Sequence, residues 1–158
     1  MKSILIKGII AKRLIEEARK YGMSLEEYLF ELLTQGLDPK DKAREYVMVA
    51  QELLEEAREE LEKDNIRQAA EKVWGATALV IKAHAFWKEG KRLVSHSELW
   101  AYKSILASEL GEWVRVVFQQ ASAMHTCFYE GWCDKGDVEA AVKAVKRLVE
   151  TITEKILC

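Results

Sequence analysis

Residues that break helices are scarce in this chain, and so are the patterns that mark a secreted or membrane protein. One proline and eight glycines occur in 158 residues, beside 49% hydrophobic and 32% charged residues. This composition describes a compact helical protein and excludes a disordered one. No apolar run reaches the thickness of a bilayer without a charge, and the start, MKSILIKGIIAKR, has lysines in its apolar part and no cleavage-site pattern. We therefore expect a soluble, cytoplasmic protein.

Cysteines are also few, and the chain needs no disulfide framework. There are three cysteines, an odd number, and no two of them form a CxxC pair, which fits a reducing compartment. A chain of this length buries a sizeable core without covalent cross-links. Cys127 and Cys133 can meet only if the helix breaks between them, and Gly131 is the candidate for that break. A zinc site from these two cysteines and His125 lacks a recognised spacing and a fourth ligand. We expect no metal and no cofactor.

Charge is low overall but unevenly distributed. The net charge is -2, yet residues 1–20 hold six basic and two acidic side chains, and residues 40–64 hold five basic and nine acidic ones. The separation either steers an anionic partner towards the N-terminal end or reflects ordinary solvated helix faces.

The segment 65–87, NIRQAAEKVWGATALVIKAHAFW, organises the rest of the chain. From Val73 onward it is apolar on almost every side, and only Thr77, Lys82 and His84 interrupt it. Such a segment, rich in Ala and Leu and free of proline, predicts a helix that needs neighbours on more than one side. Its small residues let those neighbours approach closely. We expect it to be the central helix of a bundle.

Two further helices each carry one apolar stripe. Asp38 and Pro39 are the expected N-cap and first residue of one helix, and Asp137 is the expected cap of the last. Their apolar residues follow alternating steps of four and three, which draws a stripe along one face. The stripe residues are Ala43, Val47, Ala50, Leu54, Ala57 and Leu61, and then Val138, Val142, Val145, Val149, Ile152 and Ile156.

Two more helices complete the predicted fold. A capping box from Ser95 to Glu98 opens a short helix, and another helix follows over about 112–129. The turn between the helix that begins at Pro39 and the central helix is short, which makes these two helices antiparallel neighbours. The predicted fold class is all-α: an antiparallel up-and-down four-helix bundle with a short extra helix, preceded by an N-terminal helical hairpin.

The N-terminal third predicts that hairpin and a short strand before it. Ser3 to Ile10 is a short apolar stretch of strand length, and a helix over about 11–21 follows. Ser24 and Glu27 form a near capping box for a second helix, which Gly36 ends.

The order strand, helix, turn, helix resembles the ribbon-helix-helix pattern of small dimeric DNA-binding and antitoxin proteins. Outward residues such as Lys2 and Lys7 would then read base edges. A plain helical hairpin is the alternative. The predicted domains are an N-terminal hairpin over 1–36 and a bundle over 37–158.

Three stretches carry a wider resemblance: AAEKVWGATALVIKAHA at 69–85, the Ser95-His96 dipeptide, and MHTCFYEGW at 124–132. Together they resemble the archaeal PaREP family of the HEPN (higher eukaryotes and prokaryotes nucleotide-binding) superfamily, over about 38–156. The resemblance implies a helical bundle, usually a homodimer, acting in nucleotide or RNA transactions. In many HEPN proteins an Arg, followed four to six residues later by a His, cleaves RNA without metal at the dimer interface.

This chain departs from that catalytic spacing. Arg115 and His125 are ten residues apart, which puts them about 15 Å apart along a helix and on different faces. If catalysis occurs, His125 is the candidate base towards a ribose 2′-hydroxyl, Tyr129 the proton donor, and Arg115 or a partner's lysine the stabiliser of phosphorane charge. The alternative is a packed histidine beside an interface tyrosine. We expect binding without catalysis.

Further residues are candidates for ligand binding or for an interface, each with a structural alternative. Tryptophans stack on bases or fill a core, and His84 lines a cavity or is satisfied by a buried neighbour. His96 either takes part in a site or shields a helix start. The candidates are Trp74, Lys82, His84, His96, Phe128, Glu130 and Trp132.

Three functions follow as hypotheses. The first is a HEPN-like homodimer that binds nucleotide, RNA or a partner protein. The second is a metal-independent ribonuclease. The third is an antitoxin-like or regulatory adaptor with a DNA-binding N-terminus.

Overall fold

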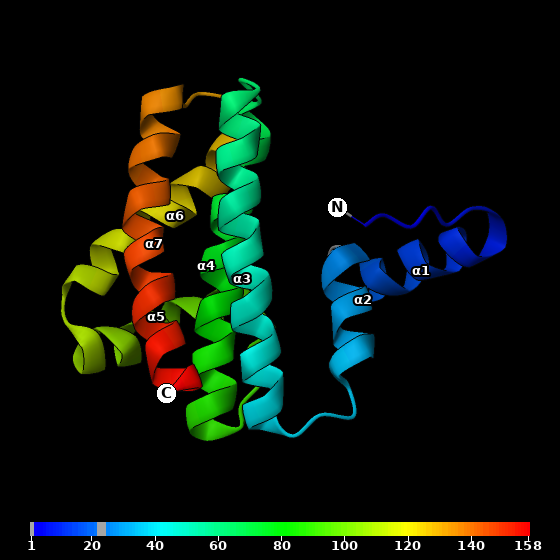
Figure 1. Ribbon diagram of the computed structural model, residues 1–158, viewed down its shortest axis with the longest axis horizontal. Helices are drawn as coiled ribbons and strands as arrows, with labels where there is room; N and C mark the ends of the chain where they lie inside the picture. The colour runs from blue at the N-terminus through cyan, green and yellow to red at the C-terminus, as the bar shows by residue number, and fades with distance from the viewer. Residues whose placement is uncertain (1, 22–24) are drawn as a thin grey trace. The chain divides into compact units, whose positions relative to one another are not determined.

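The computed structural model describes residues 2–21 and 25–158, with backbone alone at positions 26 and 27. Within these residues the chain is all-α, as predicted (Figure 1). The helices are α1 (Gly8–Lys20), α2 (Leu25–Thr34), α3 (Pro39–Glu62), α4 (Ile66–Glu89), α5 (His96–Leu110), α6 (Trp113–Glu130) and α7 (Lys135–Leu157).

Contacts along the chain divide it into two units. The N-terminal unit, Met1–Leu37, contains α1 and α2, and the core unit, Asp38–Cys158, contains α3 to α7. No helix in the described part of the chain is long and apolar enough to cross a membrane.

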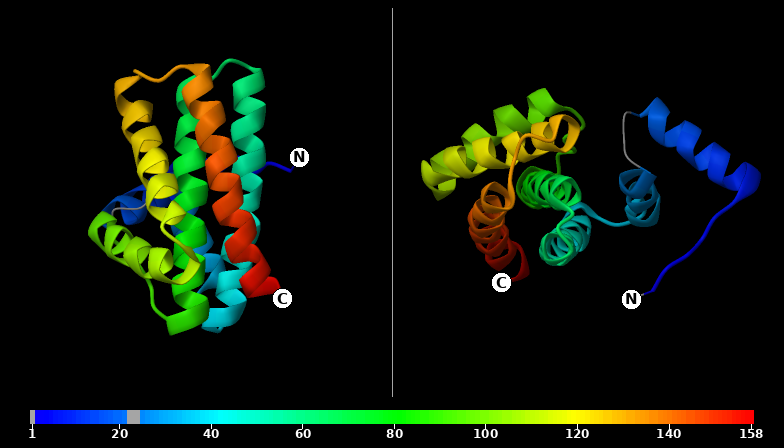
Figure 2. Two further views of the ribbon diagram at one scale, coloured as in Figure 1. Left: turned by 90° about the vertical axis from the view of Figure 1, so that its left-hand side faces the viewer. Right: turned by 90° about the horizontal axis from the view of Figure 1, so that it is seen from above.

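α4 is the centre of the core unit. It packs against α3, α5, α6 and α7, and Figure 2 shows the long helices α3, α4, α6 and α7 running alongside one another. Fourteen of its residues are buried. The helix from 65–87 was predicted to be shielded on more than one side, and this prediction is confirmed.

The striped helices also pack as predicted. All six stripe residues of α3 and all six of α7 are buried. Asp38 caps α3 by accepting hydrogen bonds from the backbone N–H groups of Lys40 and Asp41. The Ser95–Glu98 capping box is present at the start of α5. These sequence signals therefore fix where the helices start and which face they bury.

The cap of the last helix is a correction. Asp134, not Asp137, is the N-cap of α7, and Asp137 is the third helical residue, whose carboxylate accepts from the backbone N–H of Asp134. Asp134 accepts in turn from the backbone N–H of Asp137. Because the two aspartates lie three residues apart, they form a reciprocal capping box, and the first of the pair starts the helix.

The strand expected over Ser3 to Ile10 is also a correction. Described residues before Gly8 have no regular secondary structure, and α1 already begins at Gly8 rather than near residue 11. Within the described chain no second strand lies beside this stretch, and an unpaired segment has no ladder to make it a strand. The near capping box at Ser24 falls outside the described residues.

Candidate functional site

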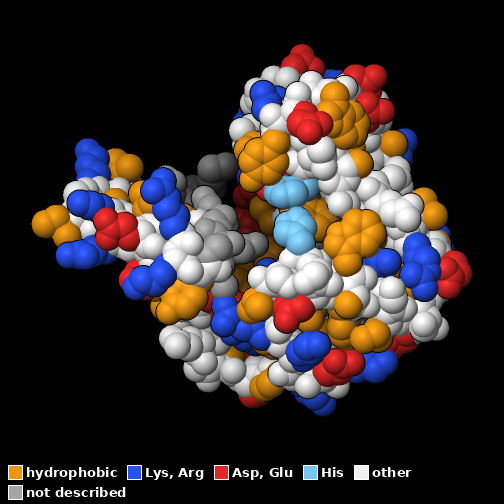
Figure 3. Space-filling model, turned by 180° about the vertical axis from the view of Figure 1, so that it is seen from behind, with side chains coloured by type: hydrophobic (Ala, Val, Ile, Leu, Met, Phe, Trp, Pro, Cys, Tyr) orange, Lys and Arg blue, Asp and Glu red, His pale blue; other side chains and the backbone are white. Residues whose placement is uncertain are grey.

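Two histidines from different helices lie next to each other on the surface of the core unit. The ring centroids of His96 and His125 are 5.3 Å apart. Trp74 of α4 lies behind both, with its ring centroid 5.4 Å from that of His96 and 5.3 Å from that of His125, at interplanar angles of 18° and 30°. Figure 3 shows two neighbouring histidine side chains bordered by hydrophobic ones. We call Trp74, His96, His125 and Tyr129 the open cluster.

Glu71 holds the imidazole of His125. The Nδ1 atom of His125 lies 3.0 Å from Oε2 of Glu71, and both side chains are partly exposed. Since an ionised carboxylate can only accept, Nδ1 carries the hydrogen and Nε2 of a neutral ring is left with its lone pair. The contact therefore sets the tautomer in which Nε2 accepts a proton or a hydrogen bond.

Helical spacing brings these side chains together. Glu71 and Trp74 are three residues apart on α4, and His125 and Tyr129 are four apart on α6, so each pair shares one face. The centroids of His125 and Tyr129 lie 5.2 Å apart with the rings nearly perpendicular, and Tyr129 is 66% exposed. His96 is the first residue of α5, placed there by the capping box.

Three structural features hold the end of α6, which lies directly beside the open cluster. Gly131 ends the helix with a φ of 70°, a left-handed conformation that favours glycine. Arg67 of α4 donates from Nε to the carbonyl of Phe128 at 2.8 Å and from Nη2 to that of Tyr129 at 2.7 Å. These bonds satisfy carbonyls that a helix end leaves without partners.

The third feature that holds the end of α6 is a disulfide between Cys127 and Cys133, whose Cα atoms are 5.8 Å apart. The break at Gly131 is what lets these cysteines meet, as the sequence indicated. The bond itself departs from the expectation of a reducing compartment, while Cys158 is a free, exposed thiol. No group of three or more His, Cys, Asp and Glu side chains within the described residues is arranged to hold a metal ion.

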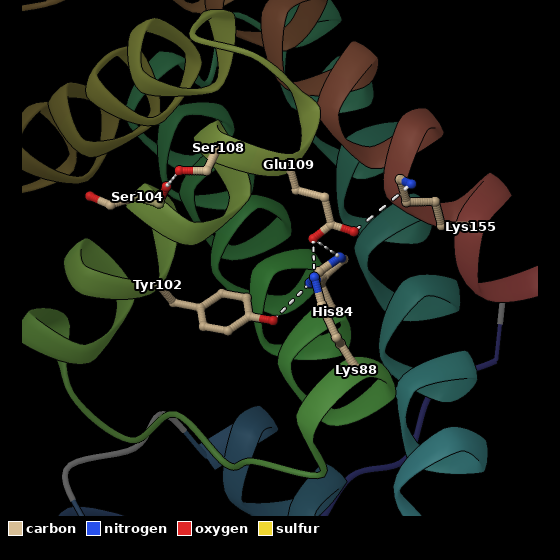
Figure 4. A network of polar contacts seen from close by, with 7 residues as sticks. All are labelled: His84, Lys88, Tyr102, Ser104, Ser108, Glu109 and Lys155. Atoms are coloured by element: carbon tan, nitrogen blue, oxygen red, sulfur yellow. Dashed lines mark hydrogen bonds and ion pairs between the residues drawn. The ribbon is translucent and has the colours of Figure 1, made fainter.

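His84 lies in a second polar cluster, which is closed. Its side chain is fully buried, and Nδ1 lies 2.8 Å from the hydroxyl of Tyr102. Nε2 is 3.5 Å from Oε2 of Glu109 but makes no hydrogen bond. Glu109 accepts from Lys88 at 2.8 Å and pairs with Lys155 at 4.0 Å (Figure 4). This closed cluster joins α4, α5 and α7.

Burial governs the acid–base state of the closed cluster. Desolvation lowers the pKa of His84, against the opposing influence of the Glu109 charge. It raises the pKa of the Tyr102 hydroxyl. Burial also opposes ionisation of Glu109, but the Lys88 hydrogen bond and nearby positive charges outweigh it and hold the pKa of that carboxyl below its ordinary value. The cluster thus favours a neutral imidazole and an ionised Glu109.

The remaining candidates lie in different places. Arg115 bonds to Glu112 at 2.6 Å and to Ser104 at 3.3 Å, at the N-terminal end of α6 and away from the open cluster. Lys82 is half-buried on α4. Trp132, 51% exposed, and the exposed Glu130 follow Tyr129 closely in sequence. The ring of Phe128 packs on that of Tyr129, with centroids 5.0 Å apart.

Sequence reasoning missed Glu71 and Arg67. Both lie on α4, and both act on α6, more than fifty residues away in sequence. The sequence held part of the signal, because Glu71 stands three residues before Trp74 in the stretch 69–85 that carries the family resemblance. Helical spacing places side chains along one helix, but it does not say which residue of another helix they meet.

The fold and the site define an all-α protein with an open histidine cluster on one face of its core unit. A model of the archaeal PaREP1/PaREP8 family matches residues 45–149, and the chain belongs to this family. Comparison with curated proteins and with solved structures finds no match.

Proposed function

We propose that the core unit is a HEPN-like up-and-down four-helix bundle, acting as a homodimer, that binds single-stranded RNA or a nucleotide at the open cluster. The observation that carries the proposal is the adjacency of His96 and His125. Two imidazoles from separate helices, bordered by the exposed Tyr129, combine groups that contact phosphate with a ring that stacks on bases.

The surroundings support a ligand with both a charged and an aromatic part. The Glu98 carboxylate already accepts from the backbone N–H groups of Val94 and Ser95 at the start of α5. The hydrogen bonds offered to a phosphate therefore come from the imidazoles rather than from these two backbone groups. Arg67 and the disulfide hold the α6 residues of the cluster in place before a ligand arrives, which reduces the entropy cost of binding.

Fluorescence anisotropy with a short, labelled single-stranded RNA tests the proposal. We expect His125→Ala, His96→Ala and Tyr129→Ala each to weaken binding by about tenfold, because one stacking or charged contact contributes about 1–3 kcal/mol. Gln119→Ala, an exposed position elsewhere on α6, is the matched control and should bind as the unchanged protein does. Equal affinity in all four variants, or no binding by the unchanged protein, contradicts the proposal.

The hydrogen bond between Glu71 and His125 favours a second candidate function, metal-independent RNA cleavage. In this scheme Nε2 of His125 takes the proton of the ribose 2′-hydroxyl, and the oxygen attacks phosphorus. The bond from phosphorus to the 5′-oxygen breaks, and a protonated His96 gives that oxygen a proton. The products are a 2′,3′-cyclic phosphate and a free 5′-hydroxyl.

An assay in excess chelator separates the two functions. Cleavage predicts a 2′,3′-cyclic phosphate product, no turnover in His125→Ala, and slower turnover in Glu71→Gln, which keeps the shape of the side chain but loses its charge. Gln119→Ala, at an exposed position of α6 with no role in the proposed reaction, is the control. Bound but intact RNA supports binding alone.

A further inference from the structure

The disulfide between Cys127 and Cys133 encloses a short segment that includes Tyr129 of the open cluster. The two cysteines are six residues apart in sequence, and His125 stands two residues before the first of them. The bond joins the last turn of α6 to the residue directly before Asp134, the N-cap of α7. Making or breaking this bond therefore acts on the α6 residues of the open cluster.

The two cysteines of the disulfide differ in their access to solvent. Cys127 is fully buried, whereas Cys133 is partly exposed and lies between two exposed residues, Trp132 and Asp134. An external thiolate therefore meets the disulfide at Cys133 rather than at Cys127. Thiol–disulfide exchange depends on such access to one of the two sulfur atoms.

A backbone hydrogen bond favours the release of the other sulfur atom. The backbone N–H of Cys133 donates to Sγ of Cys127 at 3.3 Å. Attack at Cys133 makes Cys127 the leaving thiolate, and a donor that already faces its sulfur stabilises the developing negative charge. A leaving thiolate that is better stabilised departs faster. The geometry thus favours reduction through Cys133.

The fold of the core unit does not depend on this disulfide. The bond closes a short loop, and cross-links over short loops constrain the unfolded chain least. A reduced Cys127 is still a small, buried side chain of a kind that cores accommodate. We therefore expect the core unit to stay folded after reduction.

The features that hold the end of α6 without the disulfide are weaker. Arg67, which donates to the carbonyls of Phe128 and Tyr129, is itself exposed, and Gly131 has the backbone freedom of a glycine. Hydrogen bonds at exposed helix ends open readily. In the reduced protein the last turn of α6 is therefore more mobile, and Tyr129 has to be ordered when a ligand binds.

We propose that the disulfide is a reversible redox switch that sets the RNA affinity of the open cluster, an inference that rests on the proposed function. A dithiol reductant forms a mixed disulfide with Cys133 and releases Cys127 as a thiolate, which takes up a proton. The second thiol of the reductant then displaces Cys133. The protein gains two electrons and two protons, and the reductant becomes a disulfide. The oxidised form binds RNA more tightly than the reduced form.

Fluorescence anisotropy with a labelled single-stranded RNA measures the switch. Every protein carries Cys158→Ser, which removes the free, exposed thiol. We expect treatment with dithiothreitol to weaken binding about fivefold, because side chains of the cluster then lose freedom on binding, and reoxidation with glutathione disulfide to restore it. Adding Cys133→Ser should give the affinity of the reduced form whether or not dithiothreitol is present.

Thiol titration and amide exchange test the same switch without RNA. In the folded Cys158→Ser protein, dithiothreitol should yield two free thiols, and circular dichroism should show an unchanged helix content. Amide exchange over residues 128–132 should become faster on reduction, whereas exchange in the middle of α3 should not change. A disulfide that is reduced only after denaturation, or exchange that is the same in both forms, overturns the proposal.

The RNA measurement separates failure of the switch from failure of the proposed function. Equal affinity in the oxidised and reduced forms overturns the switch and leaves RNA binding at the open cluster intact. Absence of RNA binding in both forms overturns the proposed function and, with it, the regulation of that function by the disulfide.

Discussion

His84 and His125 have opposite surroundings, although both are tied to α4. His84 belongs to that helix, and His125 is bonded to its Glu71. His84 is fully buried, bonded to Tyr102, and enclosed by the charges of Glu109 and two lysines. His125 is bonded to Glu71 but keeps a quarter of its side chain exposed. The same residue type thus serves the core at one end of α4 and faces solvent at the other. In both residues Nδ1 has a polar partner. The role of each histidine therefore depends on whether the rest of its imidazole is buried or open to solvent.

Loss of the closed cluster should have the largest effect on stability. His84→Ala leaves a cavity, removes the partner of the Tyr102 hydroxyl and leaves Glu109 without its imidazole neighbour. We expect the free energy of unfolding to fall by about 3 kcal/mol. Urea unfolding followed by circular dichroism measures this. A loss below about 1 kcal/mol would mean that the two histidines do not differ as the structure indicates.

A pH titration of stability should sharpen the comparison. The pKa of His84 lies below its ordinary value of 6.5, so the unfolded chain takes up this proton at a higher pH than the folded one. The stability contributed by neutral His84 is fully present above pH 6.5 and is lost as the pH falls towards the folded pKa, by at most about 1.4 kcal/mol per pH unit.

Urea midpoints measured between pH 7.5 and 5 should therefore fall in the unchanged protein and fall less in His84→Gln. Titration of Glu109 does not interfere, because the pKa of that carboxyl is held below 4.5, outside this range. Parallel profiles for the two proteins would assign the pH dependence to other groups.

The sequence predicts the helices better than it predicts the site. Helix starts such as Asp38 and Ser95 depend on residues three or fewer apart, and the stripes of α3 and α7 depend on helical period, so both are local. The cap at Asp134 was missed because two aspartates three apart both fit, and only the backbone decides between them.

The site was only partly predictable for a different reason. His125 and Tyr129 could be placed on one helix face, and Trp74 on the central helix. The meeting of His96 with His125, and of Glu71 with His125, depends on the rotation of α4, α5 and α6 about their axes. Side-chain packing across helices sets that rotation, and no local pattern records it.

Arg67 should matter less to stability than His84 does, and its effect should reach the open cluster. Arg67→Ala removes two hydrogen bonds to the last carbonyls of α6 at an exposed site, so we expect a loss of about 1 kcal/mol. The end of α6 should also become more mobile, with faster amide exchange near Gly131. Arg44→Ala, which removes an exposed ion pair with Asp41 on α3, is the matched control and should leave that exchange unchanged.

His96→Ala should have the smallest effect on folding, which makes it the sharpest test of the contrast with His84. The side chain is exposed and rests on one face of Trp74, so its removal should change the free energy of unfolding by no more than about 0.5 kcal/mol. The same variant is expected to lose RNA affinity. Urea unfolding and RNA anisotropy on one preparation compare the two effects directly. A large loss of stability with unchanged affinity would make the open cluster part of the core, as the closed cluster is.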